Sequence, residues 1–378
     1  MTAAETDPTR PSWMELDLEA LRQNYAELRR HLGPDVHIIA ALKADAYGHG
    51  AAAVAKALAG TDVHSLATGS FEDAMAIRAA GVELPILMFA GALPEGMGRL
   101  LAHGLTPTVY DMAGAEAVAA AAGRPTPVYV KVDAGLGRLG VALPDAVDFV
   151  SRIRELPNVV VEGVYTHLSF HDAEGKAWAA ERLAAFDALL DRLAAAGIEV
   201  PVTQALASSG LLAGLASKAN AVCPGHLLYG IPSVAAEVAP LAPYRQVLSV
   251  VKSRLIHVGP LKSGMRDARR NAPRTVGVLP FGLADGYRPV LPEQPAAVLV
   301  GGRRAPIRGV SLEHLTLDLT AQPEARVGDE AVLVGRQGED EIALSEVAAW
   351  QGTRPHHVMM AFDRKLPQHY RDGAADRS

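Results

Sequence analysis

The sequence has little cysteine, no long apolar run and no excess of positive charge. A single cysteine among 378 residues excludes an intrachain disulfide framework and fits a reducing compartment such as the cytoplasm. No apolar stretch approaches the roughly 20 residues of a membrane span. The first seven residues are polar and acidic, unlike an export signal. We therefore expect a cytoplasmic location and no membrane partner.

The charge balance argues against a nucleic-acid partner. The formal net charge is −6. The basic run Arg266-Asp267-Ala268-Arg269-Arg270 is short and contains an acid, so we interpret it as a solvated loop. A chain of this length exceeds one ordinary compact domain, and two domains are expected.

Up to about residue 235, short apolar runs alternate with longer amphipathic, alanine-rich segments such as 176–196. This rhythm predicts (β/α) units, with strands at 37–42, 64–68, 85–90, 106–109, 127–132, 159–165, 202–206 and 226–230. Eight units predict a closed (β/α)8 barrel of the TIM type, whose active site lies at the carboxyl ends of its strands. Periodicity alone leaves an open, doubly wound sheet as the alternative.

The rhythm changes near residue 240. Runs of β composition follow at 276–279, 297–300, 315–319 and 331–334, and one helical segment is expected at about 343–351. These patterns predict a β-rich C-terminal domain at 241–378 after a barrel domain at 14–240. Residues 1–13 are expected to pack with the second domain.

Residues 41–50 read Ala-Leu-Lys-Ala-Asp-Ala-Tyr-Gly-His-Gly. Lys43 directly follows the first apolar strand, where an amine beside apolar residues is partly desolvated. A lowered pKa makes such an amine a carbonyl-trapping nucleophile that forms a Schiff base. The alternative is an ordinary surface lysine. Tyr47 adds a phenol, and the two glycines permit close approach of a ligand.

This segment closely resembles the pyridoxal-phosphate lysine motif of the alanine racemase family. The resemblance extends from Trp13-Met14-Glu15-Leu16-Asp17 to Val327-Gly328-Asp329-Glu330. It implies the barrel fold, pyridoxal 5'-phosphate on Lys43 and an amino-acid substrate. It also implies a homodimer whose active site is shared between the subunits.

Further cofactor positions follow from the match with the family. Arg138 corresponds to the arginine that bonds the phenolic oxygen of the cofactor, and Lys131 to a lysine that is often carbamylated to hold that arginine. His167 corresponds to the histidine beside the ring. The phosphate side is implied to comprise Tyr47, Ser208, Ser209, Gly225 and His226. Taken alone, these residues also fit a glycine turn, a buried histidine and a helix-capping serine. No metal site is expected.

Two departures from the family concern catalysis. Cys223 stands where an arginine donates to the pyridine nitrogen. A thiol is a weak donor without permanent charge, so the ring becomes a stronger electron sink, unless Cys223 is merely a small buried residue. Leu283 stands where a tyrosine acts as the base on the face opposite the lysine, reaching the site from the other subunit. Leucine cannot move a proton.

Other departures concern the substrate entrance and the phosphate. Leu312-Glu313 replaces a Met-Asp pair that shapes the entrance from the other subunit. Arg364 stands near the place of a tyrosine that bonds the phosphate. Tyr287 matches an aromatic position and is interpreted as a packing residue. Of the family's relay of tyrosine, histidine and arginine, only His167 is kept.

The leading hypothesis is an enzyme in which Lys43 removes or returns the α-proton of an amino acid and Arg138 polarises the cofactor oxygen. Racemisation or epimerisation is the family reaction, and it leaves His167 as the second proton donor. The alternatives are one-base reactions, namely retro-aldol cleavage, decarboxylation or transamination. A non-enzymatic pyridoxal-phosphate carrier is a further alternative, against which the complete second domain counts.

Overall fold

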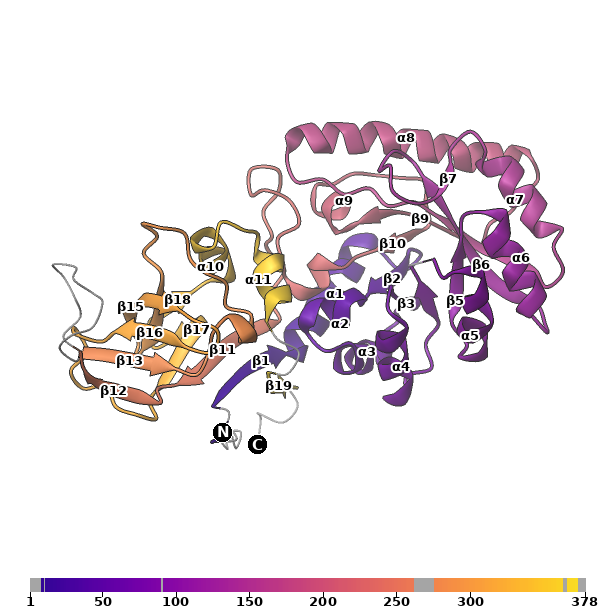
Figure 1. The fold of residues 1–378 in the computed structure, drawn as a ribbon. Coiled ribbons are helices and arrows are strands. Elements are labelled where there is room, and N and C mark those ends of the chain that lie inside the picture. The colour runs from indigo at the N-terminus through magenta and orange to yellow at the C-terminus, as the bar shows by residue number, and fades with distance from the viewer. Residues whose placement is uncertain (1–7, 10, 90, 262–274, 363–365, 373–378) are drawn as a thin grey trace. The chain divides into compact units, whose positions relative to one another are not determined.

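The computed structural model describes residues 8–9, 11–89, 91–261, 275–362 and 366–372. The chain forms two compact units. One unit comprises the described residues within 20–46 and 50–245, and the other comprises those within 1–19, 47–49 and 246–378. Each unit has its own sheet (Figure 1).

The first unit is a closed parallel barrel, as the βα rhythm predicted. Its strands follow the order β5-β4-β3-β2-β10-β9-β8-β6, and pairing between β5 and β6 closes the ring. All of these pairings are parallel. The strands are β2 (His37–Ala41), β3 (Ser65–Thr68), β4 (Ile86–Met88), β5 (Thr106–Val109), β6 (Thr126–Asp133), β8 (Val159–Tyr165), β9 (Val202–Ala207) and β10 (Ala221–Cys223), and β7 (Val141–Ala142) pairs with β6.

Helices surround these strands (Figure 1). They are α1 (Leu18–Leu32), α2 (Lys43–Gly48), α3 (Ala51–Ala59), α4 (Phe71–Ala79), α5 (Met97–Ala102), α6 (Met112–Ala121), α7 (Ala146–Arg154), α8 (Ala173–Ala195) and α9 (Ser208–Leu212), with 3₁₀ turns η1 (Pro94–Gly96) and η2 (His226–Tyr229).

Helix α8 shows how local sequence sets these elements. The Asp172 carboxylate accepts from the N–H of Gly175 at 2.8 Å and caps the first turn. Leu183, Phe186 and Leu189 recur at helical spacing and are buried. The helix begins three residues before the predicted segment and ends one residue before its end.

The predicted eighth strand at 226–230 is wrong. That segment is the 3₁₀ turn η2, and the strand is β10, which ends at Cys223. The backbone N–H groups of Gly225 and Leu227 donate to the Ser208 hydroxyl at 2.9 and 3.3 Å, so they are not available to a strand ladder. A short apolar run does not distinguish a strand from a helical turn. Cys223 therefore lies at the carboxyl end of a barrel strand, where the active sites of such barrels are located.

The second unit is built on a mostly antiparallel sheet, in the order β12-β13-β16-β15-β14-β17-β11-β1-β19, with β18 on β17. The strands are β1 (Ser12–Asp17), β11 (Leu248–Arg254), β12 (His257–Pro260), β13 (Thr275–Leu279), β14 (Ala297–Val300), β15 (Arg303–Val310), β16 (Leu315–Asp318), β17 (Glu330–Gln337), β18 (Asp340–Ile342) and β19 (Gln368–Arg371). The helical elements are η3 (Leu283–Asp285), α10 (Leu344–Trp350) and α11 (Pro355–Ala361). The helix expected at 343–351 is α10.

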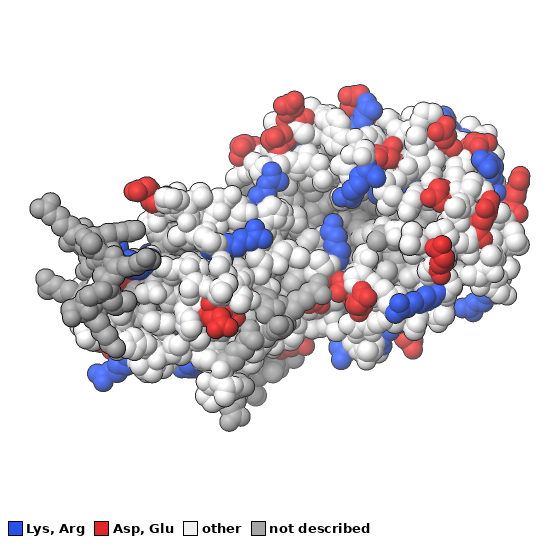
Figure 2. Space-filling model, viewed as in Figure 1, with Lys and Arg blue, Asp and Glu red and all other residues white. Residues whose placement is uncertain are grey.

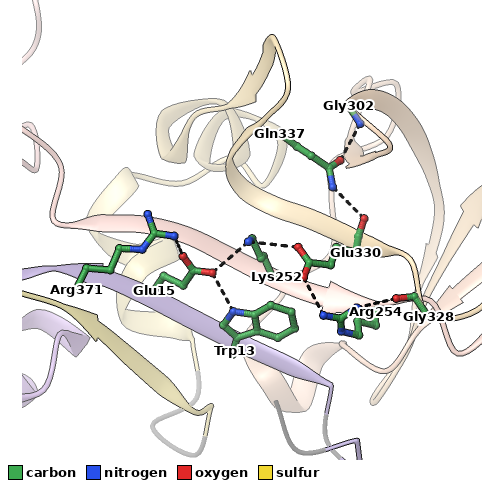
Figure 3. Close-up of polar contacts among 9 residues, drawn as sticks. All are labelled: Trp13, Glu15, Lys252, Arg254, Gly302, Gly328, Glu330, Gln337 and Arg371. Atoms are coloured by element: carbon green, nitrogen blue, oxygen red, sulfur yellow. Dashed lines mark hydrogen bonds and ion pairs between the residues drawn. The ribbon is translucent and has the colours of Figure 1, made fainter. Parts of the chain in front are cut away.

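Residues 12–17 belong to the second unit. They form β1, which pairs antiparallel with β11 and parallel with β19. A polar network crosses these strands (Figure 3). Glu15 accepts from Trp13 Nε1 at 3.1 Å, pairs with Lys252 at 3.1 Å and pairs with Arg371. Lys252 also pairs with Glu330 at 3.3 Å. Sheet pairing and this network explain why β1 lies outside the barrel.

The described surface carries mixed charge. On the visible face, acidic and basic side chains are interspersed (Figure 2). Within the described ranges, no helix combines the length and the apolarity needed to cross a membrane. The basic run at 266–270 lies outside the described residues.

Candidate active site at the strand ends of the barrel

Charged and polar side chains gather at the carboxyl ends of the barrel strands. Lys43 follows β2, Lys131 lies on β6, His167 follows β8 and Cys223 ends β10. The charges of Lys43, Lys131, Arg138 and His226 all act on His167. The structure therefore brings together six residues that the sequence predicted for the site.

The Lys43 side chain is exposed to solvent, yet the surrounding residues partly desolvate its amine. This desolvation lowers the pKa of Lys43; the Cys223 thiol acts in the opposite direction, and Arg138 adds to the lowering. Solvent access limits the size of these effects. The direction is that required of a carbonyl-trapping amine.

The backbone after Lys43 has an uncommon conformation. Ala44, Asp45, Ala46 and Tyr47 have φ angles of 56°, 56°, 53° and 57°, so α2 is a left-handed turn. For L-residues this conformation costs roughly 1–2 kcal/mol per residue. Strain of this kind persists only where surrounding contacts enforce it, and it concentrates at functional sites. The sequence predicted the lysine but not the handedness of the turn.

Lys131 is buried against an aromatic ring. Its Nζ lies 4.5 Å from the centre of the Tyr165 ring, and the Tyr165 hydroxyl is hydrogen-bonded to Thr108 Oγ1 at 3.1 Å. Burial, followed by the charge of Arg138, lowers the pKa of Lys131 to about 8. At pH 7 roughly a tenth of this amine is therefore uncharged, and at pH 8 about half. The uncharged amine is the form that reacts with carbon dioxide.

A carboxylate holds the loop that carries Arg138. Asp133 Oδ1 accepts from the N–H groups of Gly135 and Gly137 at 2.8 and 3.1 Å, and Oδ2 accepts from the N–H of Arg138 at 2.9 Å. Burial raises the pKa of Asp133, but the hydrogen bonds from these N–H groups lower it by more. The pKa of Asp133 is therefore below its ordinary value. Gly140 is required here because a Cβ would lie 2.4 Å from the Asp133 nitrogen.

His167 is held in its neutral form. Burial first, and then the charges of Lys43, Lys131, Arg138 and His226, lower the pKa of His167 to about 3. With a pKa this low, the imidazole stays neutral near neutral pH, and it is a weak base as well as an uncharged proton donor. A donor role for His167 therefore requires that part of the effect of burial and of the surrounding positive charge on this pKa be offset.

Cys223 is a neutral thiol. It is buried, and burial raises its pKa to about 12, with Lys43 and Lys131 acting in the opposite direction. The strand end therefore presents a weak donor without charge at this position.

The two adjacent serines predicted on the phosphate side differ in their hydrogen bonding. The Ser208 hydroxyl already accepts two backbone N–H groups from the turn that follows β10. By contrast, Ser209 Oγ and Thr166 Oγ1 are buried and have no hydrogen-bond partner within the described part of the chain. Buried hydroxyls are usually paired, so these two fit a polar ligand group. Together with the nearby cations, they suit an anion such as phosphate, and the site fits pyridoxal phosphate.

Three positions that the resemblance assigned to the partner-subunit side of the site lie in the second unit. Leu283 is 39% exposed and Leu312 is 71% exposed, and Glu313 is also exposed. The N–H of Leu283 donates to the Ser311 carbonyl at 3.0 Å, and that of Ala284 to the Leu312 carbonyl at 2.8 Å, so these segments adjoin.

Three further positions singled out in the sequence are Tyr287, Tyr47 and Arg364. Tyr287 is fully buried beside Phe281, as a packing residue should be. Tyr47 is buried in the left-handed turn. Arg364 lies outside the described residues. No cluster of three or more metal-binding side chains occurs among the described residues.

Comparison with known proteins identifies the family. Residues 16–233 match the model described as alanine racemase, N-terminal domain, and residues 249–370 match alanine racemase, C-terminal domain. An alanine racemase of Halothermothrix orenii is 33% identical, with 96% of this chain and 98% of the relative covered. This chain belongs to the alanine racemase family. An alanine racemase of Sorangium cellulosum is 35% identical, with 96% of this chain and 100% of the relative covered.

Solved structures agree with the family assignment. The alanine racemase of E. faecalis has a TM-score of 0.87 at 27% identity, over 97% of this chain and 100% of that chain. The enzyme of Bacillus anthracis with bound L-Ala-P has a TM-score of 0.87 at 25% identity, over 97% of each chain. The alanine racemase family consists of isomerases that depend on pyridoxal phosphate, and this chain is a racemase-like enzyme of that kind.

The sequence did not predict three residues that shape this site: Asp133, Tyr165 and Asp73. Asp133 was visible only as an acid within a glycine-rich loop. Tyr165 ends β8 with its ring toward Lys131. Asp73 lies in the first turn of α4, where an acid is ordinary, and only the folded structure shows what it contacts.

Proposed function

We propose that this chain uses pyridoxal phosphate on Lys43 to move the proton at Cα of an amino acid, with racemisation or epimerisation as the reaction. The observation that carries the proposal is Lys43 itself. It follows the first barrel strand, its pKa is lowered, and the turn that it begins is left-handed. The family's full lysine motif surrounds it.

The cofactor supplies an electron-accepting ring that stabilises negative charge at Cα. This chain's residues bind and orient it. Lys43 would hold its carbonyl carbon, Arg138 would donate to the ring oxygen, and the Ser209 hydroxyl would donate to the phosphate. As its carbamate, Lys131 would hold the Arg138 guanidinium. His226 and Gly225 would lie on the phosphate side.

Proton transfer is the step at which this chain differs from its family. Lys43 removes or returns the proton on its own face of the substrate. On the opposite face, the partner subunit's Leu283 cannot act as a base, so the second proton comes through His167, directly or through water. An anion held beside Lys43 and Arg138 would offset part of the positive charge that, after burial, keeps the His167 pKa low.

One observation favours a second candidate function. With leucine at 283 and a neutral His167, only Lys43 is a ready base. One-base reactions on the same cofactor, such as retro-aldol cleavage, decarboxylation or transamination, need no second base. The carrier alternative has less support, because the matches cover the second domain as well as the barrel.

The deciding experiment measures exchange and chirality together. Purified protein loaded with pyridoxal phosphate is incubated in deuterium oxide with a panel of amino acids, and each product is analysed for deuterium at Cα and for configuration. Racemisation with exchange supports the main proposal, whereas exchange with retained configuration supports one-base chemistry. An absorbance band of bound cofactor that no amino acid alters would support the carrier alternative.

A further inference from the structure

The left-handed turn after Lys43 needs tertiary contacts to persist, because Ala44, Asp45 and Ala46 all carry a Cβ and gain nothing from this conformation. One local bond, from the Ala46 N–H to the Leu42 carbonyl at 2.9 Å, closes the turn. A right-handed turn would provide an equivalent bond without the strain. Contacts from outside the segment therefore determine that the turn is left-handed.

Asp73 provides an outside contact to the turn. Its Oδ2 accepts from the backbone N–H of Asp45 at 2.9 Å. Asp73 is only 4% exposed, and a buried carboxylate bond to a backbone N–H is charge-assisted and strong. The acceptor thus contacts the middle of the strained stretch, two residues after the lysine.

Asp73 is itself fixed in place. Its backbone N–H donates to the Ser70 side chain at 3.1 Å, which caps helix α4. Thr68 Oγ1, at the end of β3, lies 3.3 Å from the same Oδ2. The carboxylate is therefore anchored both to the neighbouring strand and to the helix that follows it.

Asp45 connects this anchor to the rest of the chain. Its N–H is taken by Asp73, while its Oδ1 accepts from the N–H of Ala51 at 2.7 Å and its carbonyl accepts from Gly50 at 3.0 Å. The residue therefore fixes the exit of the turn into α3 as well as its middle. Losing the Asp73 contact releases the part nearest Lys43.

We propose that Asp73 is a positioning residue that holds the left-handed turn and thereby directs the Lys43 amine. Asp73 does not touch reacting atoms. The inference rests on the proposed function in that it takes Lys43 as the cofactor lysine. The competing explanation is that Asp73 merely stabilises α4.

The test compares Asp73→Ala with Asp73→Asn and with a matched control. The control is Asp111→Ala, because Asp111 Oδ1 likewise accepts a backbone N–H, from Gly114 at 2.7 Å, at the start of α6. Three quantities are measured without substrate: the melting temperature, hydrogen exchange of the peptide spanning 43–51, and the rate at which pyridoxal phosphate forms its absorbing adduct on Lys43. Borohydride trapping and peptide mapping confirm the adduct's location.

In Asp73→Ala, we expect adduct formation to slow by about tenfold or more, because small displacements of a reacting group have large rate costs. Exchange in the 43–51 peptide should rise. Asp73→Asn should stay near the unaltered protein, since its amide oxygen still accepts. Asp111→Ala should lower the melting temperature without changing adduct formation.

A second-site change keeps the test decisive if Asp73→Ala is poorly stable. Glycine adopts the left-handed conformation without a steric cost, so Ala44→Gly should restore part of the adduct rate in the Asp73→Ala background. A purely structural role in α4 predicts no such rescue. Equal adduct rates in Asp73→Ala, Asp111→Ala and the unaltered protein would overturn this inference alone. An adduct on another lysine in the unaltered protein would instead refute the proposed function.

Discussion

Lys43 is the residue on which the proposed chemistry depends. Replacing it with alanine removes the amine that holds the cofactor carbonyl, so the visible band of lysine-bound cofactor should disappear. The barrel should still fold, because Lys43 contributes no apolar burial to the core. Absorbance spectra with circular dichroism as a folding control test this expectation, and borohydride-trapped cofactor on a different lysine of the unaltered protein would contradict it.

Lys131 should react with carbon dioxide as pH rises. Its pKa of about 8 means that the uncharged amine becomes abundant between roughly pH 7 and 9. The amine nitrogen then bonds to the carbon of carbon dioxide and releases one proton. With ¹³C-labelled bicarbonate, a carbamate signal should grow over this range in NMR spectra and be absent from Lys131→Ala. A pH-independent absence in the unaltered protein would show that the lysine stays an amine.

Leu283 and Cys223 test whether the missing relay limits racemisation. Alanine racemisation by the unaltered protein should be weak, while Lys43 should still exchange the α-proton of a suitable substrate on its own face. Leu283→Tyr alone should restore little, because Cys223 leaves the far end of the relay empty. The double change to tyrosine and arginine should exceed the combined single effects, as expected of residues that act as a unit.

The matching control for the relay is His167. If His167 supplies the second proton, its replacement by alanine should reduce racemisation more than deuterium exchange. Efficient alanine racemisation that survives the loss of His167 would show that the proton comes from elsewhere.

At the scale of elements, the Glu15 network makes the second unit sensitive to acid. Burial raises the pKa of Glu15, but hydrogen bonds from Trp13 and Lys252 and the charges of Lys252 and Arg371 bring it below its ordinary value. A lowered folded-state pKa contributes stability that is present above the unfolded pKa of about 4.3 and is lost as pH falls through the folded value. Melting temperatures measured over a range of pH should show this loss.

Glu15→Gln should flatten that pH dependence and cost on the order of 1–3 kcal/mol near neutral pH, as for other buried charged hydrogen bonds. The control is Glu324→Gln, whose ion pair with Arg303 is exposed on both sides. It should change the melting temperature little. Equal effects of the two substitutions would argue against a special role for the network.

The elements differ in how far the sequence reveals them. Short apolar runs between helical segments predicted seven barrel strands near their observed places, because buried parallel strands are short, uninterrupted stretches of apolar residues. The eighth was misplaced because the apolar run at 226–230 fits a helical turn equally well. The left-handed turn at 44–47 could not be predicted from local propensity, because alanine favours the right-handed helix. The contact with Asp73 that supports the turn is tertiary and is not visible in the local sequence. The lysine, arginine and histidine of the site were predicted from strand-end positions together with the family resemblance, whereas their supporting carboxylates were not.

At the scale of the whole molecule, we expect a homodimer whose active site is completed by the second domain of the partner. Leu283 and Leu312 are exposed apolar residues at the family positions that act across subunits. Sedimentation should give twice the chain mass of 39.7 kDa. Leu312→Asp should shift the equilibrium toward monomer, while Leu93→Asp, at an equally exposed leucine of the barrel unit, should not. A fully active monomer at micromolar concentration would refute this prediction.

The pairing of β1 with β11 has a consequence for synthesis. Ser12 and Ser253 are hydrogen-bonded across 241 residues of sequence, so the barrel is an insertion between two neighbouring strands of another sheet. At roughly 5–20 residues per second, β1 leaves the ribosome on the order of 10–50 s before β11. Met14 and Leu16, buried in the finished sheet, stay uncovered while the barrel has time to close. Strand β1 is thus translated well before β11, and its place in the sheet can form only after the whole barrel segment has been made.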